Sequence, residues 1–370
     1  MSTPFRYAHA AGEDWREIAQ SCLRQLAGGP PATLGFIYLT DLLAAQADDI
    51  TAFFRERTGV QHWVGSTGIG ICATGREYFD EPAIAVMLAD FAPGSFQVFS
   101  GIRTADDIKM RKFNCGERAA NFAIVHADPV NSSVPELIAG IAAKVESGFV
   151  VGGLSSSRGE NLQIAEKTHE GGLSGVLLSD EITVATRLTQ GCSPAGPVHK
   201  ITDAQRNIIL KLDGRLALDV LKEDVGEKIT RDVQRLAGTV FAGLTVAGSD
   251  TGDYLVRNLV GIDGERGLVA IGDNAAEGAE LMFCRRDNAS AVEDMQRMLA
   301  SIQEGLYTKP RGALYFSCLG RGANLFGPDS EELKLIQAGL GDLPLVGFFC
   351  NGEISHNRLY GYTGVLTLFA

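Results

Sequence analysis

The sequence predicts a mixed α+β fold in which duplicated strand–helix–strand–strand units form two pseudo-equivalent halves, with their sheets covered by helices. Two observations carry this prediction. Short, continuously apolar runs alternate with amphipathic segments, which is the pattern of buried strands between surface helices. The order strand, helix, strand, turn, strand also returns at least three times, at unequal and domain-sized intervals that differ from those of a solenoid.

The elements can be placed in order along the chain. An amphipathic helix is predicted over 13–27 and ends at the Gly-Gly-Pro-Pro sequence of 28–31. The first unit then has a strand at 34–39, a helix at 47–57, a strand at 62–66, a glycine-rich turn and a strand at 83–91. The second has a strand at 121–127, a helix at 133–147, a strand at 149–153, a turn at 155–160 and a strand at 175–180. The third has a strand at 312–320, a helix at 329–341, a strand at 344–349, a turn at 350–353 and a strand at 363–369.

A stretch rich in glycine and proline over 191–197 interrupts this pattern and suggests a domain boundary at about residue 195. We therefore expect an N-terminal helical segment over 1–29, a first half over 30–195 and a second half over 196–370. The length of 370 residues fits two domains, at roughly 100–200 residues per domain.

Charge and composition narrow the classes of protein. Asp and Glu number 45 against 33 Lys and Arg, which gives a net charge of −12. Nucleic acid is not an expected partner, because phosphate binding requires clustered basic residues. No apolar run approaches the ~18 residues of a membrane span, and the N-terminus lacks a signal-peptide core, so we expect a cytoplasmic protein without membrane contact.

The densest turn, over 65–77, carries glycines whose spacing superficially matches a dinucleotide-binding fingerprint. That fingerprint needs a helix directly after it, whereas a strand is expected here. The sequence also lacks a phosphate-binding P-loop and the nucleophile elbow of an esterase. These turns therefore indicate another kind of site.

A small or polar turn followed by a glutamate recurs at Glu77, Glu160 and Glu353. Backbone N–H groups in such turns can form a concavity for an anion, and a neighbouring glutamate can bind an amine. Arg321 lies between two glycines after a strand, a suitable place to bind a carboxylate. In the structural alternative, each of these turns is a bulged turn whose glutamate accepts hydrogen bonds from backbone N–H groups.

The candidate ligand-binding residues follow from these turns. Arg321 would be a second anchor for the anionic end of a ligand, and Glu353 would face its cationic end. The first anchor for the anionic end would be the backbone N–H groups near Ser66, Thr67, Ser155 and Ser156. The full candidate set is Ser66, Thr67, Arg76, Glu77, Ser155, Ser156, Arg158, Cys318, Arg321, Asn351 and Glu353.

The seven cysteines include no CxxC pair and no histidine at zinc-ligand spacing, so neither a structural zinc nor another metal site is expected. Free thiols fit a reducing compartment. Cys318 and Cys350 each stand at a strand end beside a glycine-rich turn, which makes them candidates for reactivity, against the alternative of small buried hydrophobes. The six histidines form no ligand pair, but a single axial haem ligand leaves almost no sequence signature.

Several stretches of the chain resemble the FIST domain, named for F-box and intracellular signal-transduction proteins. Residues 62–88 resemble its N-terminal half, and 190–218 resemble the junction between its halves. Its C-terminal half resembles 254–263, 281–289, 312–327 and 345–369. The resemblance covers about residues 30–370, and it identifies 30–195 and 196–370 with the two halves of the family.

The resemblance implies a sensory module of bacterial type that binds a small molecule such as an amino acid. Relatives act with histidine kinases or cyclic-dinucleotide enzymes, so we expect a stand-alone input module that signals through such a separate protein. Some relatives are haem-based nitric-oxide sensors, which is the alternative function. A cysteine-dependent enzyme is the third hypothesis. No catalytic motif is recognised, so we expect that the protein is not an enzyme.

Overall fold

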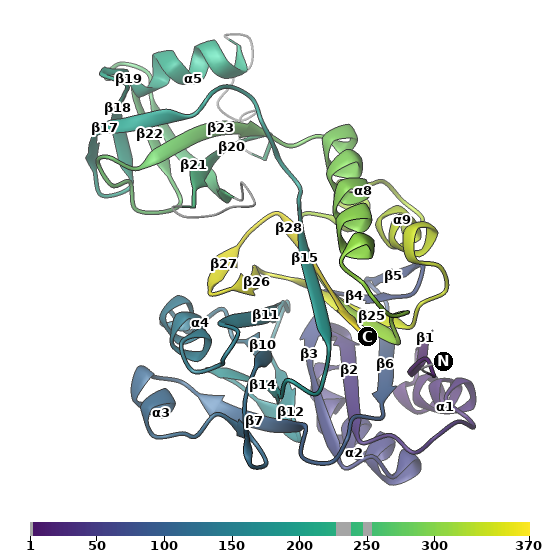
Figure 1. The fold of residues 1–370 in the computed structure, drawn as a ribbon. Helices are drawn as coiled ribbons and strands as arrows, with labels where there is room; N and C mark the ends of the chain where they lie inside the picture. The colour runs from purple at the N-terminus through teal and green to yellow at the C-terminus, as the bar shows by residue number, and fades with distance from the viewer. Residues whose placement is uncertain (1–2, 227–237, 247–253) are drawn as a thin grey trace. The chain divides into compact units, whose positions relative to one another are not determined.

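The computed structural model describes residues 3–226, 238–246 and 254–370 of a strand-rich, mixed α+β protein (Figure 1). The chain forms two compact units. Unit 1 is discontinuous and consists of Met1–Thr189 and Met295–Ala370, and unit 2 consists of Gln190–Asp294. The boundary expected at residue 195 falls just inside unit 2.

Unit 1 contains three copies of one order of elements: an edge strand, a helix, a strand, a second helix, a strand, a hairpin and a last strand. The first repeat has β1 Arg6–Ala11, α1 Trp15–Gln25, β2 Leu34–Thr40, η1 Asp41–Gln46, α2 Ala47–Thr58, β3 His62–Gly68, the hairpin β4 Gly70–Ala73 and β5 Arg76–Phe79, and β6 Ala83–Ala89. The N-terminal helix and the three strands predicted for this repeat are confirmed.

The second and third repeats follow the same order. The second has β7 Phe96–Ile102, α3 Ala105–Lys109, the short pair β8 Asn114–Cys115 and β9 Arg118–Ala119, β10 Phe122–Ala127, α4 Val134–Ala142, β11 Phe149–Leu154, β12 Gln163–Ala165, β13 Lys167–His169 and β14 Leu173–Leu178. The third has β15 Val184–Gln190, α8 Asn288–Glu304, β24 Gly312–Cys318, η2 Gly322–Asn324, α9 Glu331–Leu340, β25 Leu345–Cys350, β26 Glu353–His356, β27 Arg358–Tyr360 and β28 Thr363–Phe369. Unit 2 is inserted between β15 and α8.

Three six-stranded sheets show the repeat directly. Their orders are β1-β6-β2-β3-β12-β13, β7-β14-β10-β11-β26-β27 and β15-β28-β24-β25-β4-β5. In each sheet the two strands before and after the second helix are parallel, and the hairpin at the end comes from another repeat. The hairpins are thus exchanged in a cycle of three. The expected two pseudo-equivalent halves are therefore replaced by three equivalent repeats.

One glycine in each repeat allows this close pairing. Gly65, Gly152 and Gly347 lie at the same position of β3, β11 and β25, opposite Ile37, Val125 and Tyr315. A Cβ atom at these glycines would lie 1.6, 1.8 and 1.8 Å from the carbonyl oxygen of the facing residue. The sheets therefore require glycine here.

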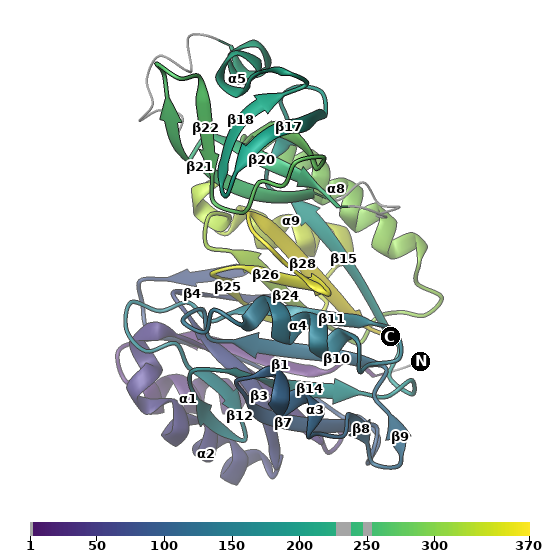
Figure 2. The ribbon, with the colours of Figure 1, turned by 90° about the vertical axis from the view of Figure 1, so that its left-hand side faces the viewer.

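The inner faces of the three sheets share one apolar core, which includes Phe36 of the first, Ile124 of the second and Leu314 of the third repeat. Helices cover the outer faces: α1 and α2 pack on the first sheet, and α3 and α4 on the second (Figure 2). Helix α2 forms because Ile50, Thr51 and Phe54 place one buried stripe toward the sheet while its other face is polar.

Equivalent residues of the three repeats meet in the middle of this core. Tyr38, His126 and Phe316 occupy the same position of β2, β10 and β24, one residue after the partners of the three glycines. The ring centroids of Tyr38 and His126 are 5.6 Å apart, and those of His126 and Phe316 are 6.1 Å apart. The sheets therefore surround an approximate threefold axis.

Unit 2 has its own architecture. It contains β16 Ser193–Pro194, β17 His199–Gln205, β18 Ile208–Leu212, β19 Arg215–Leu216, α5 Ala217–Val225, β20 Val240–Thr245, β21 Tyr254–Asp263, β22 Leu268–Ile271 and β23 Glu280–Arg285. Six of its strands close in the order β20-β21-β22-β18-β17-β23, because β23 pairs with β20 again, and form a small antiparallel barrel. Helix α5 shares its apolar core.

Candidate functional site

The hydroxyl residues of the candidate set meet where β3 and β11 end. The Oγ atoms of Ser66 and Ser155 are 2.8 Å apart. Ser156 Oγ donates to the Phe349 carbonyl at 2.6 Å, and the hydroxyl of Thr67 donates to the Leu162 carbonyl at 3.3 Å. All four side chains are buried. Their hydroxyls therefore connect the repeats to one another, and their predicted role in binding an anion stays a prediction.

Glu77 lies on β5, beside the start of α9. Burial and the nearby Glu332 together raise the pKa of its carboxyl to about 8, against the backbone N–H groups of Leu333 and Ala323, which lower it. The backbone N–H of Glu77 donates to Ser330 Oγ at 2.9 Å. Glu77 thus joins the hairpin of the first repeat to the N-terminus of α9 in the third. Its carboxyl accepts hydrogen bonds from backbone N–H groups, as in the structural alternative for the Gly-Glu turns.

Two of the predicted arginines lie at the surface. Arg76 covers the ring of Tyr78, with 5.4 Å between its guanidinium carbon and the ring centroid. Arg158 is half-exposed and forms ion pairs with Asp41 and Asp80. The partners in these interactions, Tyr78, Asp41 and Asp80, do not belong to the candidate set.

A buried polar cluster gathers the remaining candidates in the third repeat. Arg321 follows β24 and is completely buried. Its Nε donates to Glu332 Oε1 at 2.8 Å, and the same oxygen accepts from Tyr315 Oη at 2.6 Å and from Ser317 Oγ at 3.0 Å. The other carboxylate oxygen accepts from the Gly322 backbone at 2.7 Å. This network neutralises the guanidinium charge within the protein and fixes its orientation.

Glu353, at the start of β26, is the second charged group of the cluster. It is completely buried, and its Oε2 accepts from the Thr363 backbone N–H at 3.0 Å and from Thr363 Oγ1 at 2.8 Å. Burial raises the pKa of Glu353 to about 8, although Thr363 and the nearby Arg321 oppose the rise. The carboxyl is therefore mostly protonated at neutral pH.

Two buried polar atoms of this cluster have no hydrogen-bond partner in the described part of the chain: Arg321 Nη1 and Glu353 Oε1. Leaving such a group unsatisfied costs about 1–3 kcal/mol, and more when it is charged. Most buried polar atoms in folded proteins have a partner, so a donor and an acceptor left open in one cluster make this cluster the candidate ligand site.

Cys318 and Asn351 complete the third-repeat candidates. Burial and the neighbouring Glu353 raise the pKa of the Cys318 thiol to about 12, against the backbone N–H groups of Gly320 and Tyr362, which lower it. Cys318 is the one cysteine that is partly exposed, and the other six are buried. The Asn351 side chain is exposed, and its backbone N–H donates to the Leu154 carbonyl at 3.1 Å.

The sequence pattern did not predict four residues of the buried cluster: Glu332, Tyr315, Ser317 and Thr363. Glu332 did carry a signal: it lies four residues before Ile336, on the stripe of α9 that also buries Leu333. A glutamate on the apolar stripe of a helix requires a buried partner.

Glu160 follows a third Gly-Glu turn but is exposed and lies outside any strand. The strand registers show Gln163 and Ile71, not Glu160 and Glu77, as the equivalents of Glu353 in the other repeats.

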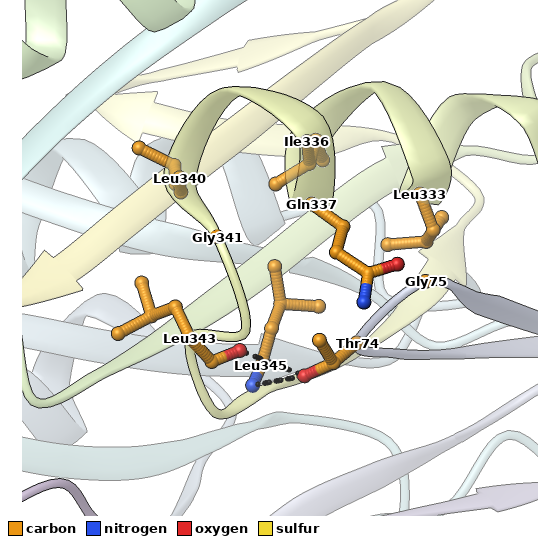
Figure 3. Close-up of a pocket in the computed structure, with 9 residues that line it drawn as sticks. All are labelled: Thr74, Gly75, Leu333, Ile336, Gln337, Leu340, Gly341, Leu343 and Leu345. Carbon is orange, nitrogen blue, oxygen red and sulfur yellow. Dashed lines mark hydrogen bonds between the residues drawn. The ribbon is translucent and has the colours of Figure 1, made fainter.

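The cavity beside α9 does not supply a ligand site. Thr74, Leu333, Gln337, Leu343 and their neighbours enclose about 10 Å³, which is room for about one water molecule (Figure 3). Thr74 Oγ1 donates to the Leu343 carbonyl and accepts from the Leu345 N–H, so its polar groups are satisfied. Among the described residues, no three His, Cys, Asp or Glu side chains are placed to hold a metal ion.

Two family models together match most of the chain. The FIST N domain matches residues 33–215, and the FIST C domain matches residues 217–356. The chain therefore belongs to the FIST family, a family of sensory signalling domains. The two matches meet at residues 215–217, between β19 and α5, so their junction lies within the small barrel of unit 2.

The chain is also similar to mycobacterial proteins. It is 32% identical over 371 residues, 95% of each chain, to an uncharacterized protein of Mycobacterium tuberculosis. It is 30% identical over 372 residues to an uncharacterized protein of Mycobacterium bovis, which covers 95% of this chain and 94% of the relative. Within the described residues, no helix is both long enough and apolar enough to cross a membrane.

Proposed function

We propose that this protein is a sensory module that binds a small polar, amino-acid-like ligand at the buried cluster of Arg321 and Glu353. The observation that carries the proposal is the pair of open buried atoms, Arg321 Nη1 and Glu353 Oε1. One is a fixed donor and the other belongs to an ionisable carboxyl, so the pair has the chemistry to bind a ligand with a carboxylate at one end and an amine at the other.

The charge state of Glu353 gives this binding a proton signature. Its pKa is raised to about 8, so the free protein holds a proton on this carboxyl at pH 7. An ammonium group brought next to the carboxyl favours the ionised form and lowers that pKa. Ligand binding at pH 7 is therefore expected to release a proton from Glu353.

The output would be a changed contact with a separate signalling protein, such as a histidine kinase or a cyclic-dinucleotide enzyme. The family supports this part of the proposal, because FIST domains are sensory. The thiols support a binding role over cysteine-dependent catalysis. Burial raises the pKa of Cys318 to about 12 and that of Cys350 well above its usual value, whereas a nucleophilic cysteine needs a lowered pKa.

Thermal-shift and calorimetric titration against a panel of amino acids and related metabolites tests the proposal. We expect at least one member to stabilise the wild type, and we expect E353Q and R321K to weaken its binding by at least roughly tenfold, the loss of one charge-assisted hydrogen bond. E160Q is the matched control, because Glu160 is an exposed Gly-Glu glutamate outside the cluster. The proposal fails if no member binds, or if E353Q binds as tightly as the wild type.

A second candidate, a haem-based nitric-oxide sensor, is favoured by the surroundings of His62. This histidine lines a cavity of about 350 Å³ with Pro93, Phe96 and Val98. Its Nδ1 lies 2.8 Å from Glu166 Oε1. A carboxylate at one ring nitrogen orients the other nitrogen as a metal ligand, so His62 would hold the haem iron and Glu166 would orient its ring. A bound haem would supply the iron that binds nitric oxide.

The absorption spectrum of protein produced with added haem tests this second function. A Soret band in the wild type that H62A loses would support it. H169A should keep the band, because His169 Nε2 contacts the Ala165 carbonyl and lies outside the cavity. Absence of the band, or its persistence in H62A, would exclude haem ligation at His62.

A further inference from the structure

Cys318 and Cys350 form a pair to which the binding proposed at Arg321 and Glu353 assigns no role. They are direct partners in the parallel pairing of β24 and β25, each as the last residue of its strand. Side chains of directly opposed residues in neighbouring strands leave the same face of the sheet. The two sulfur atoms therefore lie on one side of the third sheet, beside the buried cluster.

The spacing of the strands suits a bond between these residues. Neighbouring strands lie about 4.8 Å apart. The Cα atoms of disulfide-bonded cysteines are usually between about 4.4 and 6.8 Å apart. The Cys318 thiol contributes to raising the pKa of Cys350, which also indicates that the two thiols are close.

The two thiols differ in access. Cys318 is partly exposed, whereas Cys350 is completely buried. The sulfur of Cys318 also has polar neighbours: the backbone N–H groups of Gly320 and Tyr362 point to it, and the Glu353 carboxyl lies nearby. Glu353 Oε1 is buried and has no hydrogen-bond partner among the described residues. An oxidant from solvent would thus meet Cys318 first, in a polar setting.

We propose that Cys318 and Cys350 are an oxidisable pair, in which a hydroperoxide oxidises Cys318 and Cys350 then closes an intramolecular disulfide. This goes beyond ligand sensing and does not depend on it.

In the first step, the Cys318 sulfur attacks the hydroperoxide: an S–O bond forms, the O–O bond breaks, and the thiol proton ends on the departing alcohol or water. In the second step, the Cys350 sulfur attacks the Cys318 sulfenic acid, the S–S bond forms, and the hydroxyl leaves with the Cys350 proton as water. In total, two thiols and one hydroperoxide yield one disulfide, one alcohol or water, and one further water.

The reaction is expected to be slower than that of an exposed, activated thiol. Burial raises the pKa of both thiols, so little thiolate is present at neutral pH. The charged and titratable groups near Cys318 are Glu353 and Arg321. Those near Cys350, apart from Cys318 itself, are Glu353 and Cys72.

Peptide mapping of the folded, full-length protein after treatment with excess hydrogen peroxide tests the proposal. Free thiols are first blocked by alkylation under denaturing conditions. Trypsin then releases Cys318 in the peptide 312–321 and Cys350 in the peptide 335–358. We expect these two peptides as one disulfide-linked species in the wild type, and as separate peptides after reduction.

C318S and C350S should each abolish the linked species. C115S is the matched control, because Cys115 is a buried cysteine of the second repeat, and it should retain the linked species. Two results would overturn the proposal: sulfinic or sulfonic acid on Cys318 with Cys350 still alkylated, or both thiols unmodified in protein that remains folded.

Discussion

At the scale of single residues, the Arg321–Glu332 pair shows how much a buried charge depends on its partner. Both side chains are completely buried, and Glu332 also accepts from Tyr315 and Ser317. Removing one partner of a buried pair leaves the other charge uncompensated, which typically costs about 3–5 kcal/mol. The pair is thus a structural requirement of the cluster as well as its anchor.

We predict that R321M and E332Q each lower the free energy of unfolding by about 3–5 kcal/mol. The double variant R321M/E332Q should cost clearly less than the sum of the two, because neither charge is then left alone. Urea unfolding followed by circular dichroism measures all three. Additive effects would show that the two side chains do not stabilise each other.

Glu353 and Glu77 give a pH dependence whose sign can be worked out. Both carboxyls have a pKa near 8 in the folded protein, raised by burial from an ordinary value of 4.5. Between these values the folded chain holds protons that the unfolded chain has released, so stability falls as the pH rises. His126 acts in the opposite direction, but only below its ordinary pKa of 6.5, because burial lowers its pKa to about 3.

We therefore predict that the free energy of unfolding falls between pH 6.5 and pH 8, by at most roughly 1.4 kcal/mol per pH unit for each glutamate. E353Q should reduce this slope, because the variant cannot ionise. Chemical unfolding at a series of pH values provides the measurement. An identical slope in wild type and E353Q would contradict the assignment.

Part of the candidate site could be proposed from the sequence because its local signals were strong. Arg321 between glycines and Glu353 after a turn were both found in this way, and the structure places them in one cluster. Glu332 was missed because its partners Tyr315 and Arg321 lie on separate elements, and only the fold brings them together. The sequence pattern matched Glu77 with Glu353, whereas the strand register matches Ile71 with Glu353. The two were confused because the hairpins differ in length between repeats.

At the scale of elements, the three equivalent glycines of β3, β11 and β25 allow the paired parallel strands of each sheet to approach closely. A Cβ atom at Gly65 or Gly347 would overlap the backbone of the neighbouring strand, which cannot move without breaking the pairing. At Gly159, by contrast, the nearest atom to a new Cβ would be Ser157 Oγ at 3.9 Å.

We predict that G65A and G347A lower the free energy of unfolding by roughly 3 kcal/mol or prevent folding. G159A should change it by less than about 0.5 kcal/mol. Thermal unfolding, together with the yield of folded protein, compares the three variants. If G65A matched G159A, the close approach of β2 and β3 would be wrong.

The elements themselves were largely predictable, and their pairing was not. The continuously apolar strands β2, β10 and β24 were found because they are buried on both faces. The edge strands β1, β7 and β15 were missed, since their half-exposed side chains give no continuous apolar run. No local pattern in a hairpin could show that it completes the sheet of another repeat.

At the scale of the whole molecule, the position of unit 2 within the third repeat makes it an insertion. In the first and second repeats the edge strand leads directly to its helix, as β1 leads to α1 and β7 to α3. Unit 2 has its own apolar core. The three-repeat body therefore contains every sheet partner that it needs without this unit.

We predict that replacing 191–286 with a short Gly/Ser linker leaves unit 1 folded, with a cooperative thermal transition. Deleting the second repeat, 96–178, should abolish that transition, because β3 then loses β12, and β26 loses β11. Circular dichroism and calorimetry of both variants make the comparison. Loss of the transition in the first variant would show that unit 1 requires the inserted unit.

The cyclic exchange of hairpins also has a consequence for synthesis of the chain. The hairpin β4–β5 is made early, but its partner β25 belongs to the third repeat and is made much later. Strand β11 likewise pairs with β26, which is synthesised later. Until then these strands keep unpaired edges, which are sites for aggregation. The third repeat must therefore be synthesised before the three sheets can be completed, and a chain truncated before β25 would be exposed to aggregation at those same edges.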